Sequence, residues 1–262
     1  MDISVIVSFY KKLDNLSIIL KALNEQSFTS FEVIISEDNN AEATKRFIAT
    51  QQTNVFFRIK HVFQEDKGFR KTKALNQSLR ISEGKIIVFL DGDCIPHTHF
   101  LQAFHDNVQE KTACFGRRVF LNKKYSTSIL QTQDLNQLSV FRTALHVDEG
   151  WRYGIYLPFQ FINRLARKGI YGCNWGIYKH HLVEVNGFDE DYELAGFGED
   201  TDIEWRLVAN GIRLQSTRNK TIVYHLFHTS NYSQEEIEKN RLVYTKKLNK
   251  GDFICKNGLV QK

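Results

Sequence analysis

The 262-residue sequence predicts an α/β fold, a mainly parallel sheet flanked by helices, with a second and smaller half. In the first half, short runs rich in Val, Ile and Phe alternate with segments of helical periodicity, which is typical of βαβ units. Residues 86–90 are five consecutive apolar residues, too few for a buried helix, and are expected to form a central strand buried on both faces. No repeat, low-complexity tract or Pro/Gly linker divides the chain, so we expect one compact unit.

The remaining elements follow from periodicity, caps and stop signals. Apolar spacing of i, i+3, i+4 and i+7 predicts a helix over residues 16–23, and a capping box at Ser233 predicts the start of a last helix. The other expected strands cover residues 3–8, 31–36, 55–62, 113–120, 212–215 and 221–226. Residues 122–168 show weaker patterns, with a polar helix expected near 129–145.

The composition excludes several classes of protein. A hydrophobic fraction of 42% and a charged fraction of 25% are typical of a globular domain. The net charge of +5 suits anionic substrates or a membrane surface but is too small to predict nucleic-acid binding. The four cysteines have no CxxC spacing, so we expect free thiols in a reducing compartment. Without a secretory signal or an apolar run of ~18 residues, the protein is expected in the cytoplasm, or peripherally at the inner face of the membrane.

Two carboxylates follow the predicted central strand, in Asp91-Gly92-Asp93. Buried carboxylates require a partner or a metal, and ligands bind beyond the carboxyl ends of strands in open α/β sheets. Asp-x-Asp on a strand places both side chains on one face, which suits a hard divalent cation. The alternative is a solvated Asp-Gly turn. We therefore expect a metal and phosphate site at Asp91 and Asp93.

Other polar residues are open to two interpretations. Glu199 and Asp200 follow two glycines at an expected helix start, where acids also serve as simple first-turn caps. His225 and His228 end an apolar strand and are either packed residues or metal ligands. The basic segment 70–73 is either a solvated helix face or a phosphate contact at a helix start.

Taken together, these motifs resemble the family-two glycosyltransferases with a GT-A fold, over about residues 3–228. Ser8 and Tyr10 fall on the nucleotide-contacting positions at the end of that family's first strand, although the family's proline and asparagine are absent. Ser36-Glu37-Asp38-Asn39-Asn40 is similar to the family's Asp-Asp-Gly-Ser. Asp38 then matches the acid that contacts uracil, and Glu37 replaces the usual first Asp.

The resemblance extends through the basic segment and the acidic motif. Lys73 takes the position of the family's nucleotide-contacting arginine. Asp91-Gly92-Asp93 matches the metal motif, which implies that Asp93 is a direct ligand and that Asp91 lies nearer the ribose.

The second half looks like the acceptor half of galactosyltransferases. The matching motifs, in order, are residues 172–176, 186–190 and 198–202. The resemblance implies that Asp200 is the catalytic base and that Glu199 and Trp175 contact the acceptor. His225 best matches the third metal ligand, with His228 as its rival.

The resemblance implies a metal-dependent inverting glycosyltransferase that uses Mn²⁺ or Mg²⁺. Its donor is expected to be a nucleotide sugar, with UDP favoured by the resemblance alone. Its acceptor is a hydroxyl of a glycan or lipid-linked saccharide, in bacterial surface polysaccharide synthesis. Residues 1–110 would form the nucleotide-sugar half and 111–230 the acceptor half of one domain. Residues 231–262 would form a basic helix and tail, either docked on the domain or in contact with an anionic membrane.

Two other classes of function remain as alternatives. In an aspartate-nucleophile phosphatase or phosphotransferase, Asp91 would be phosphorylated and Asp93 would act as the acid. That class usually carries its motif on the first strand, whereas here the motif follows a later strand. A non-catalytic sugar- or nucleotide-binding protein would keep the fold alone, but the presence of both acidic motifs and His225 argues against it.

Overall fold

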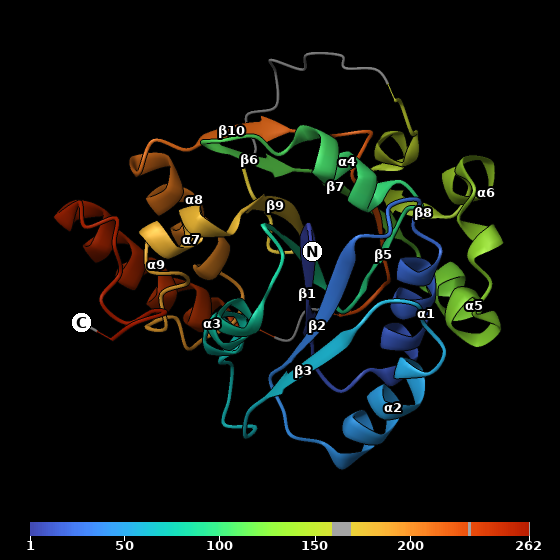
Figure 1. Cartoon of the computed structure of the whole chain (residues 1–262), viewed down its shortest axis with the longest axis horizontal. Helices are drawn as coiled ribbons and strands as arrows, with labels where there is room; N and C mark the ends of the chain where they lie inside the picture. The colour runs from blue at the N-terminus through green and yellow to red at the C-terminus, as the bar shows by residue number, and fades with distance from the viewer. Residues whose placement is uncertain (159–168, 230–231, 262) are drawn as a thin grey trace.

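The computed structural model describes residues 1–158, 169–229 and 232–261 (Figure 1). Its strands are β1 (Ile3–Phe9), β2 (Phe31–Glu37), β3 (Ile59–Phe63), β4 (Ile86–Asp91), β5 (Cys94–Pro96), β6 (Thr112–Phe115), β7 (Arg117–Leu121), β8 (Val147–Glu149), β9 (Asn174–Tyr178), β10 (Arg213–Ser216) and β11 (Ile222–His225). Its helices are α1 (Leu13–Asn24), α2 (Glu42–Gln52), α3 (Lys71–Ile81), α4 (Phe100–Asn107), α5 (Lys123–Thr132), α6 (Val140–Ala144), α7 (Lys179–Glu184), α8 (Glu199–Ala209) and α9 (Gln234–Lys250).

The strands form two sheets. The larger sheet has the order β10-β6-β9-β4-β1-β2-β3, and the smaller one has the order β5-β11-β7-β8. Strands β4, β1, β2 and β3 run parallel, whereas β9 is antiparallel to both of its neighbours, β4 and β6. The predicted α/β architecture with a mainly parallel sheet is therefore confirmed.

Strand β4 lies in the middle of the larger sheet, as its apolar sequence predicts. Ile87, Val88 and Leu90 are fully buried because β1 and β9 cover its edges and helices cover both faces. The parallel register aligns Ser8 of β1 with both Ser36 of β2 and Asp91 of β4. The carboxyl ends of these three strands therefore meet at one edge of the sheet.

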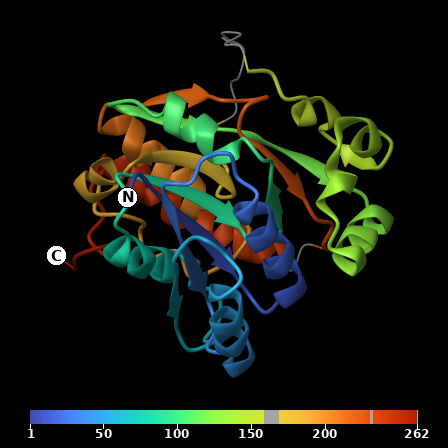
Figure 2. The ribbon, with the colours of Figure 1, turned by 45° about the vertical axis from the view of Figure 1, so that its right-hand side comes forward.

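Helices cover the two faces of the larger sheet. One face packs against α1 and α4, through residues such as Leu16 and Phe100. The other packs against α3, α7 and α8, through Leu75, Leu182 and Ile203. Figures 1 and 2 show α1 and α2 on one side of the sheet and α3, α7, α8 and α9 on the other. This division follows the alternation of side chains along each strand.

The prediction of one strand over residues 113–120 is wrong. The chain instead changes sheets at Gly116, with β6 before it and β7 after it. A Cβ at Gly116 would lie 2.3 Å from the Thr221 carbonyl oxygen, so only glycine allows the two backbones to approach here. A local apolar pattern does not reveal this crossing because the neighbouring segment lies far away in the sequence.

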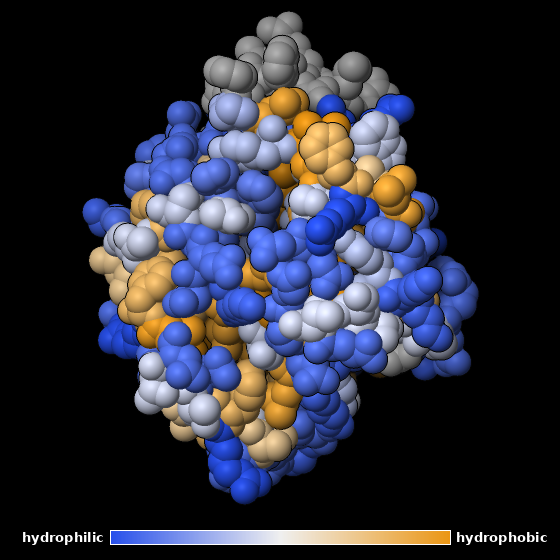
Figure 3. All heavy atoms as spheres, turned by 90° about the vertical axis from the view of Figure 1, so that its right-hand side faces the viewer, coloured by the Kyte–Doolittle hydropathy of each residue, from blue (hydrophilic) through white to orange (hydrophobic). Residues whose placement is uncertain are grey.

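The expected helix near residues 129–145 is two short helices, α5 and α6. Gln133 takes a left-handed conformation that ends α5, and the Asp134 side chain accepts a hydrogen bond from the Asn136 amide in the next turn. Helix α6 exposes Phe141 and Leu145, at 89% and 80% of their surfaces. Figure 3 views the side of the molecule on which α5 and α6 lie and shows apolar residues gathered on a largely hydrophilic surface. This region packs less deeply than the two sheets.

The C-terminal segment is docked on the second half of the chain. Ser233 forms the predicted capping box at the start of α9. The buried Asn240 side chain donates hydrogen bonds to the carbonyl oxygens of Leu194 and Phe197, at 2.7 and 2.6 Å. Lys247 pairs with Asp189 and Asp191. No helix in the described parts of the chain is both long and apolar enough to cross a membrane.

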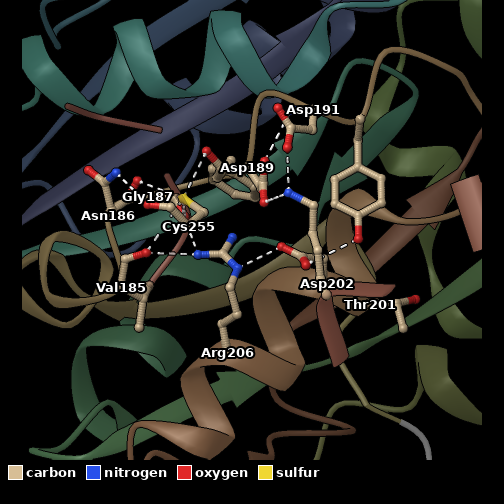
Figure 4. Close-up of polar contacts among 12 residues, drawn as sticks. Val185, Asn186, Gly187, Asp189, Asp191, Thr201, Asp202, Arg206 and Cys255 are labelled. Carbon is tan, nitrogen blue, oxygen red and sulfur yellow. Dashed lines mark hydrogen bonds and ion pairs between the residues drawn. The ribbon is translucent and has the colours of Figure 1, made fainter. Parts of the chain in front are cut away.

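A buried ion pair fixes α8 against the loop that precedes it (Figure 4). Arg206 Nε lies 2.6 Å from Asp202 Oδ2, and both side chains are buried. Arg206 Nη1 also donates to the carbonyl oxygens of Val185 and Gly187, at 2.9 and 2.8 Å. Tyr192 donates its hydroxyl to the other carboxylate oxygen of Asp202, at 3.1 Å. The helix that begins with Glu199 and Asp200 therefore has a rigid base.

We predict that Arg206→Met lowers the free energy of unfolding by about 3–5 kcal/mol, because it leaves the Asp202 carboxylate buried without its cation. Urea denaturation measures this loss. The control is Arg241→Met, which removes an exposed pair with Glu238 at 3.4 Å and should cost less than about 1 kcal/mol. Equal losses in the two variants would contradict the anchoring role of Arg206.

Candidate functional site

A cavity of about 540 Å³ opens where the carboxyl ends of β1, β2 and β4 meet. Most of the residues expected to bind the donor line it: Ser8, Tyr10, Asp38, Asp91 and Asp93. These residues come from strands far apart in the sequence. The parallel order of the strands brings them together, in agreement with the crevice expected for an open α/β sheet.

Asp38 is held in a fixed orientation on the wall of this cavity. Its Oδ1 accepts a hydrogen bond from Gln64 Nε2 at 2.6 Å, and its Oδ2 accepts one from the Arg70 backbone amide at 2.7 Å. Each carboxylate oxygen keeps a further lone pair for a ligand. Ser36, also on the wall, has a buried hydroxyl with no hydrogen-bond partner among the described residues. This part of the cavity thus offers polar groups to an incoming molecule.

Tyr10 lies at the exposed rim. Its hydroxyl donates to Asp66 at 3.1 Å, and Lys11 pairs with the same carboxylate at 2.7 Å. About half of the Tyr10 surface, 51%, is open to solvent. The ring is therefore available to stack on a flat ligand group.

Asp93 lies beside two histidines at one end of the cavity. Its Oδ2 lies 3.0 Å from His228 Nε2 and 3.5 Å from His225 Nε2. One ligand atom from each residue lies within 4.8 Å of the others, a spacing that allows a single cation to be bound by all three. The sequence leaves His225 and His228 as rivals, whereas the structure brings both to Asp93.

The charges of this triad depend on one another. Burial raises the pKa of Asp93, but the hydrogen bond with His228 and the charge of His225 outweigh it and hold that pKa well below its usual range. The hydrogen bond to Asp93 raises the pKa of His228. Burial lowers the pKa of His225. Asp93 is therefore an anion that faces two imidazole nitrogens, a set of donors suited to a divalent metal.

Lys71 is a site residue that the sequence analysis did not single out. Its Nζ lies 3.0 Å from Asp91 Oδ1 and 3.6 Å from Glu199 Oε1. Burial lowers its pKa, but the Asp91 and Glu199 carboxylates outweigh burial and raise that pKa above its ordinary value. Lys71 thus connects the donor cavity to the N-terminus of α8.

The structure does not bring the expected residue Lys73 to the cavity. Lys73 is exposed and is not among the lining residues, because it lies on the outer side of α3. Lys71 instead lies on the same side of the helix as Leu75 and Ser78, which are buried. The apolar periodicity of α3 is the sequence signal that distinguishes the two lysines.

Glu199 and Asp200 occupy the first turn of α8. Burial raises the pKa of Glu199, with Lys71 opposing that effect and Asp200 adding to it. Asp200 Oδ1 accepts a hydrogen bond from the Thr201 amide at 2.8 Å. Asp200 Oδ2 makes no hydrogen bond with a described residue, so this oxygen can accept a proton from a ligand.

Trp175 lies elsewhere than expected. Its ring is 1% exposed and stacks on Phe89 with centroids 4.3 Å apart. Because β9 is an interior strand, the side chain packs in the core between the sheet and α8. Trp175 supports the acceptor half from within and does not reach an acceptor in this arrangement.

Comparison with known proteins was made for the whole chain. The model of "Glycosyl transferase family 2" matches residues 4–177, and that of the "N-terminal domain of galactosyltransferase" matches residues 160–229. The chain is 26% identical over 260 residues to validoxylamine A glucosyltransferase of Streptomyces hygroscopicus subsp. jinggangensis. That match covers 92% of this chain but only 60% of the length of the relative.

Solved structures share the fold. S. aureus TarS 1–349 in complex with UDP-GlcNAc has a TM-score of 0.63 at 17% identity, over 95% of this chain and 66% of that one. The mannosyltransferase PcManGT from Pyrobaculum calidifontis, in complex with GDP-Man and Mn²⁺, has a TM-score of 0.59 at 16% identity, over 95% and 64%. The predicted GT-A fold is confirmed. Because the family 2 model matches more than half of its residues, the chain belongs to glycosyl transferase family 2.

Proposed function

We propose that this protein is a metal-dependent, inverting glycosyltransferase. It moves a sugar from a UDP-sugar to a hydroxyl of a glycan or lipid-linked acceptor. The observation that carries the proposal is the continuity of the site. The Asp93, His225 and His228 triad lies at one end of the cavity, and Lys71 joins Asp91 there to Glu199, next to Asp200. A role in bacterial surface polysaccharide synthesis rests on the resemblance to the family.

The triad fits a divalent metal. One carboxylate oxygen and two imidazole nitrogens lie close enough to share an ion, and this mixture of donors favours Mn²⁺ over Mg²⁺. Asp93, His225 and His228 would hold it. When bound, the ion supplies positive charge against the diphosphate that departs. The Mn²⁺ complex of the mannosyltransferase from Pyrobaculum calidifontis supports a metal in this fold.

The opposite end of the cavity suits a nucleoside. Asp38 presents an oriented carboxylate able to accept a hydrogen bond from a base N–H group, as the resemblance to the family implies for uracil. The unpartnered Ser36 hydroxyl and the exposed Tyr10 ring add a polar contact and a stacking surface. Asp91 lies between this end and the triad, where a ribose would bind. The UDP-GlcNAc complex of TarS supports UDP as the nucleotide.

Asp200 is proposed as the general base. It accepts the proton of the acceptor hydroxyl while the hydroxyl oxygen bonds to the anomeric carbon and the bond from that carbon to the diphosphate breaks. A single displacement of this kind inverts the anomeric centre. Lys71 favours the anionic form of Glu199, which then accepts a hydrogen bond from another acceptor hydroxyl.

We predict that UDP binds in the presence of Mn²⁺ and that Asp93→Ala weakens this binding more than about 100-fold, because loss of a ligand exceeds the effect of losing a supporting group. Isothermal titration with and without Mn²⁺ measures it. The matched control, Asp106→Ala, removes an exposed acid of α4 and should not change the affinity. Absence of UDP binding to the wild type under both conditions would overturn the UDP assignment.

We predict that Asp200→Asn lowers kcat by about 10²–10⁴-fold and leaves the affinity for UDP and Mn²⁺ within about twofold, because the amide cannot take the proton. Turnover is measured with a UDP-sugar that the wild type uses. The control Asp252→Asn alters an exposed acid beyond α9 and should keep full activity. Retention of more than half of the wild-type kcat in Asp200→Asn would exclude it as the base.

The affinity for Mn²⁺ should fall as the pH decreases from 7.5 to 5.5. Protonated imidazole cannot bind a metal, and Asp93 raises the pKa of His228 above the ordinary value of about 6.5, so protons compete from that pH downward. Electron paramagnetic resonance of free Mn²⁺ in the presence of UDP measures the affinity. His228→Ala should bind more weakly at pH 7.5 and respond less steeply to pH. An affinity that does not change over this range would argue against imidazole ligands.

A further inference from the structure

Arg118 lies on the same face of the smaller sheet as the metal triad. In the parallel pairing of β7 with β11, Phe120 aligns with His225 and Arg118 aligns with Val223. Because side chains alternate along a strand, Arg118, Phe120 and His225 all point to one face. Arg118 is thus placed next to the site by the same register that places His225.

Two aromatic rings hold the Arg118 guanidinium. Its central carbon lies 4.9 Å from the centroid of the Phe120 ring and 5.3 Å from that of Tyr171. A planar guanidinium stacks readily on aromatic faces and keeps its N–H groups free for bidentate contacts at the edge. The rings therefore restrict the orientation of the cation and satisfy none of its hydrogen-bond donors.

Arg118 also has no hydrogen bond or ion pair with another residue in the described parts of the chain. Lys71, on the other side of Asp91, is paired with both Asp91 and Glu199. The carboxylate of Asp93 faces the two histidines. A half-buried guanidinium with five free N–H donors is suited to a planar or tetrahedral anion.

The anion is not expected to be the donor diphosphate. The donor cavity is lined by Asp91 and Asp93 but not by Arg118, Phe120 or Tyr171. The backbone next to Arg118 instead reaches the acceptor side. A Cβ on Gly172, which follows Tyr171, would lie 3.2 Å from Lys71 Nζ, and that amine contacts Glu199.

We propose that Arg118 forms a subsite for an anionic group, a phosphate or a carboxylate, carried by the acceptor. This inference rests on the proposed function and specifies its acceptor as a negatively charged saccharide or a phosphate-linked one. The bound anion would lie against the guanidinium edge, next to the Lys71 and Glu199 pair and close to the proposed base. Arg118 then aligns the acceptor without taking part in the bond changes.

The test uses the full chain loaded with UDP and Mg²⁺, and methyl phosphate as the probe, with its binding followed by ³¹P nuclear magnetic resonance. Arg118→Met should weaken methyl phosphate binding by at least about tenfold, because a charge-assisted pair is lost. Arg118→Lys should lose less, since it keeps the charge but not the bidentate edge. UDP affinity should stay within about twofold in both variants, and the lysine variant keeps the test valid should the methionine variant unfold.

The matched control is Arg218→Met, which removes another arginine stacked on a tyrosine, 5.7 Å from the Tyr153 ring, and should not change methyl phosphate binding. Equal methyl phosphate binding in wild type and Arg118→Met would overturn the proposal. So would a loss of UDP affinity in Arg118→Met with methyl phosphate binding unchanged, which would assign the cation to the donor. A wild type that binds UDP but not methyl phosphate refutes the subsite alone, whereas a wild type that binds no UDP refutes the proposed function.

Discussion

The close crossing of the chain at Gly92 is the constraint on which the rest of the site depends. The Gly92 amide donates to the Ser8 carbonyl at 2.7 Å, and a Cβ at this position would lie 2.8 Å from the same oxygen. The larger sheet ends at Asp91, and the smaller sheet begins just after Asp93. The two carboxylates are therefore held by different sheets. Asp91 faces Lys71, whereas Asp93 faces the histidines.

The balance of charge around these two carboxylates explains how the site combines binding and catalysis. Lys71 lies between Asp91 and Glu199 and so couples the donor side to the first turn of α8. The buried Arg206 and Asp202 pair fixes that helix. Asp93 and its two histidines carry the negative charge and the lone pairs that a divalent metal requires. Arg118 is the cation that this account leaves for the acceptor.

The sequence predicts those parts of the fold and site that depend on local patterns. The apolar run of residues 86–90 identifies the central strand, and acids directly after it identify Asp91 and Asp93. Long-range contacts are not visible in such patterns. For this reason the break at Gly116, the burial of Trp175 and the choice of Lys71 over Lys73 emerge only from the structure. Residues 122–158 have weak patterns because few of their side chains reach the core.

The central claim is that Asp93, His225 and His228 hold the metal that binds the donor diphosphate. Pulsed electron paramagnetic resonance of Mn²⁺ bound to the protein with UDP tests it most directly, because it detects nuclei next to the ion. The account predicts couplings from imidazole nitrogen and from phosphorus, with the nitrogen coupling reduced in His225→Ala and in His228→Ala. Phosphorus coupling without any nitrogen coupling in the wild type would contradict it.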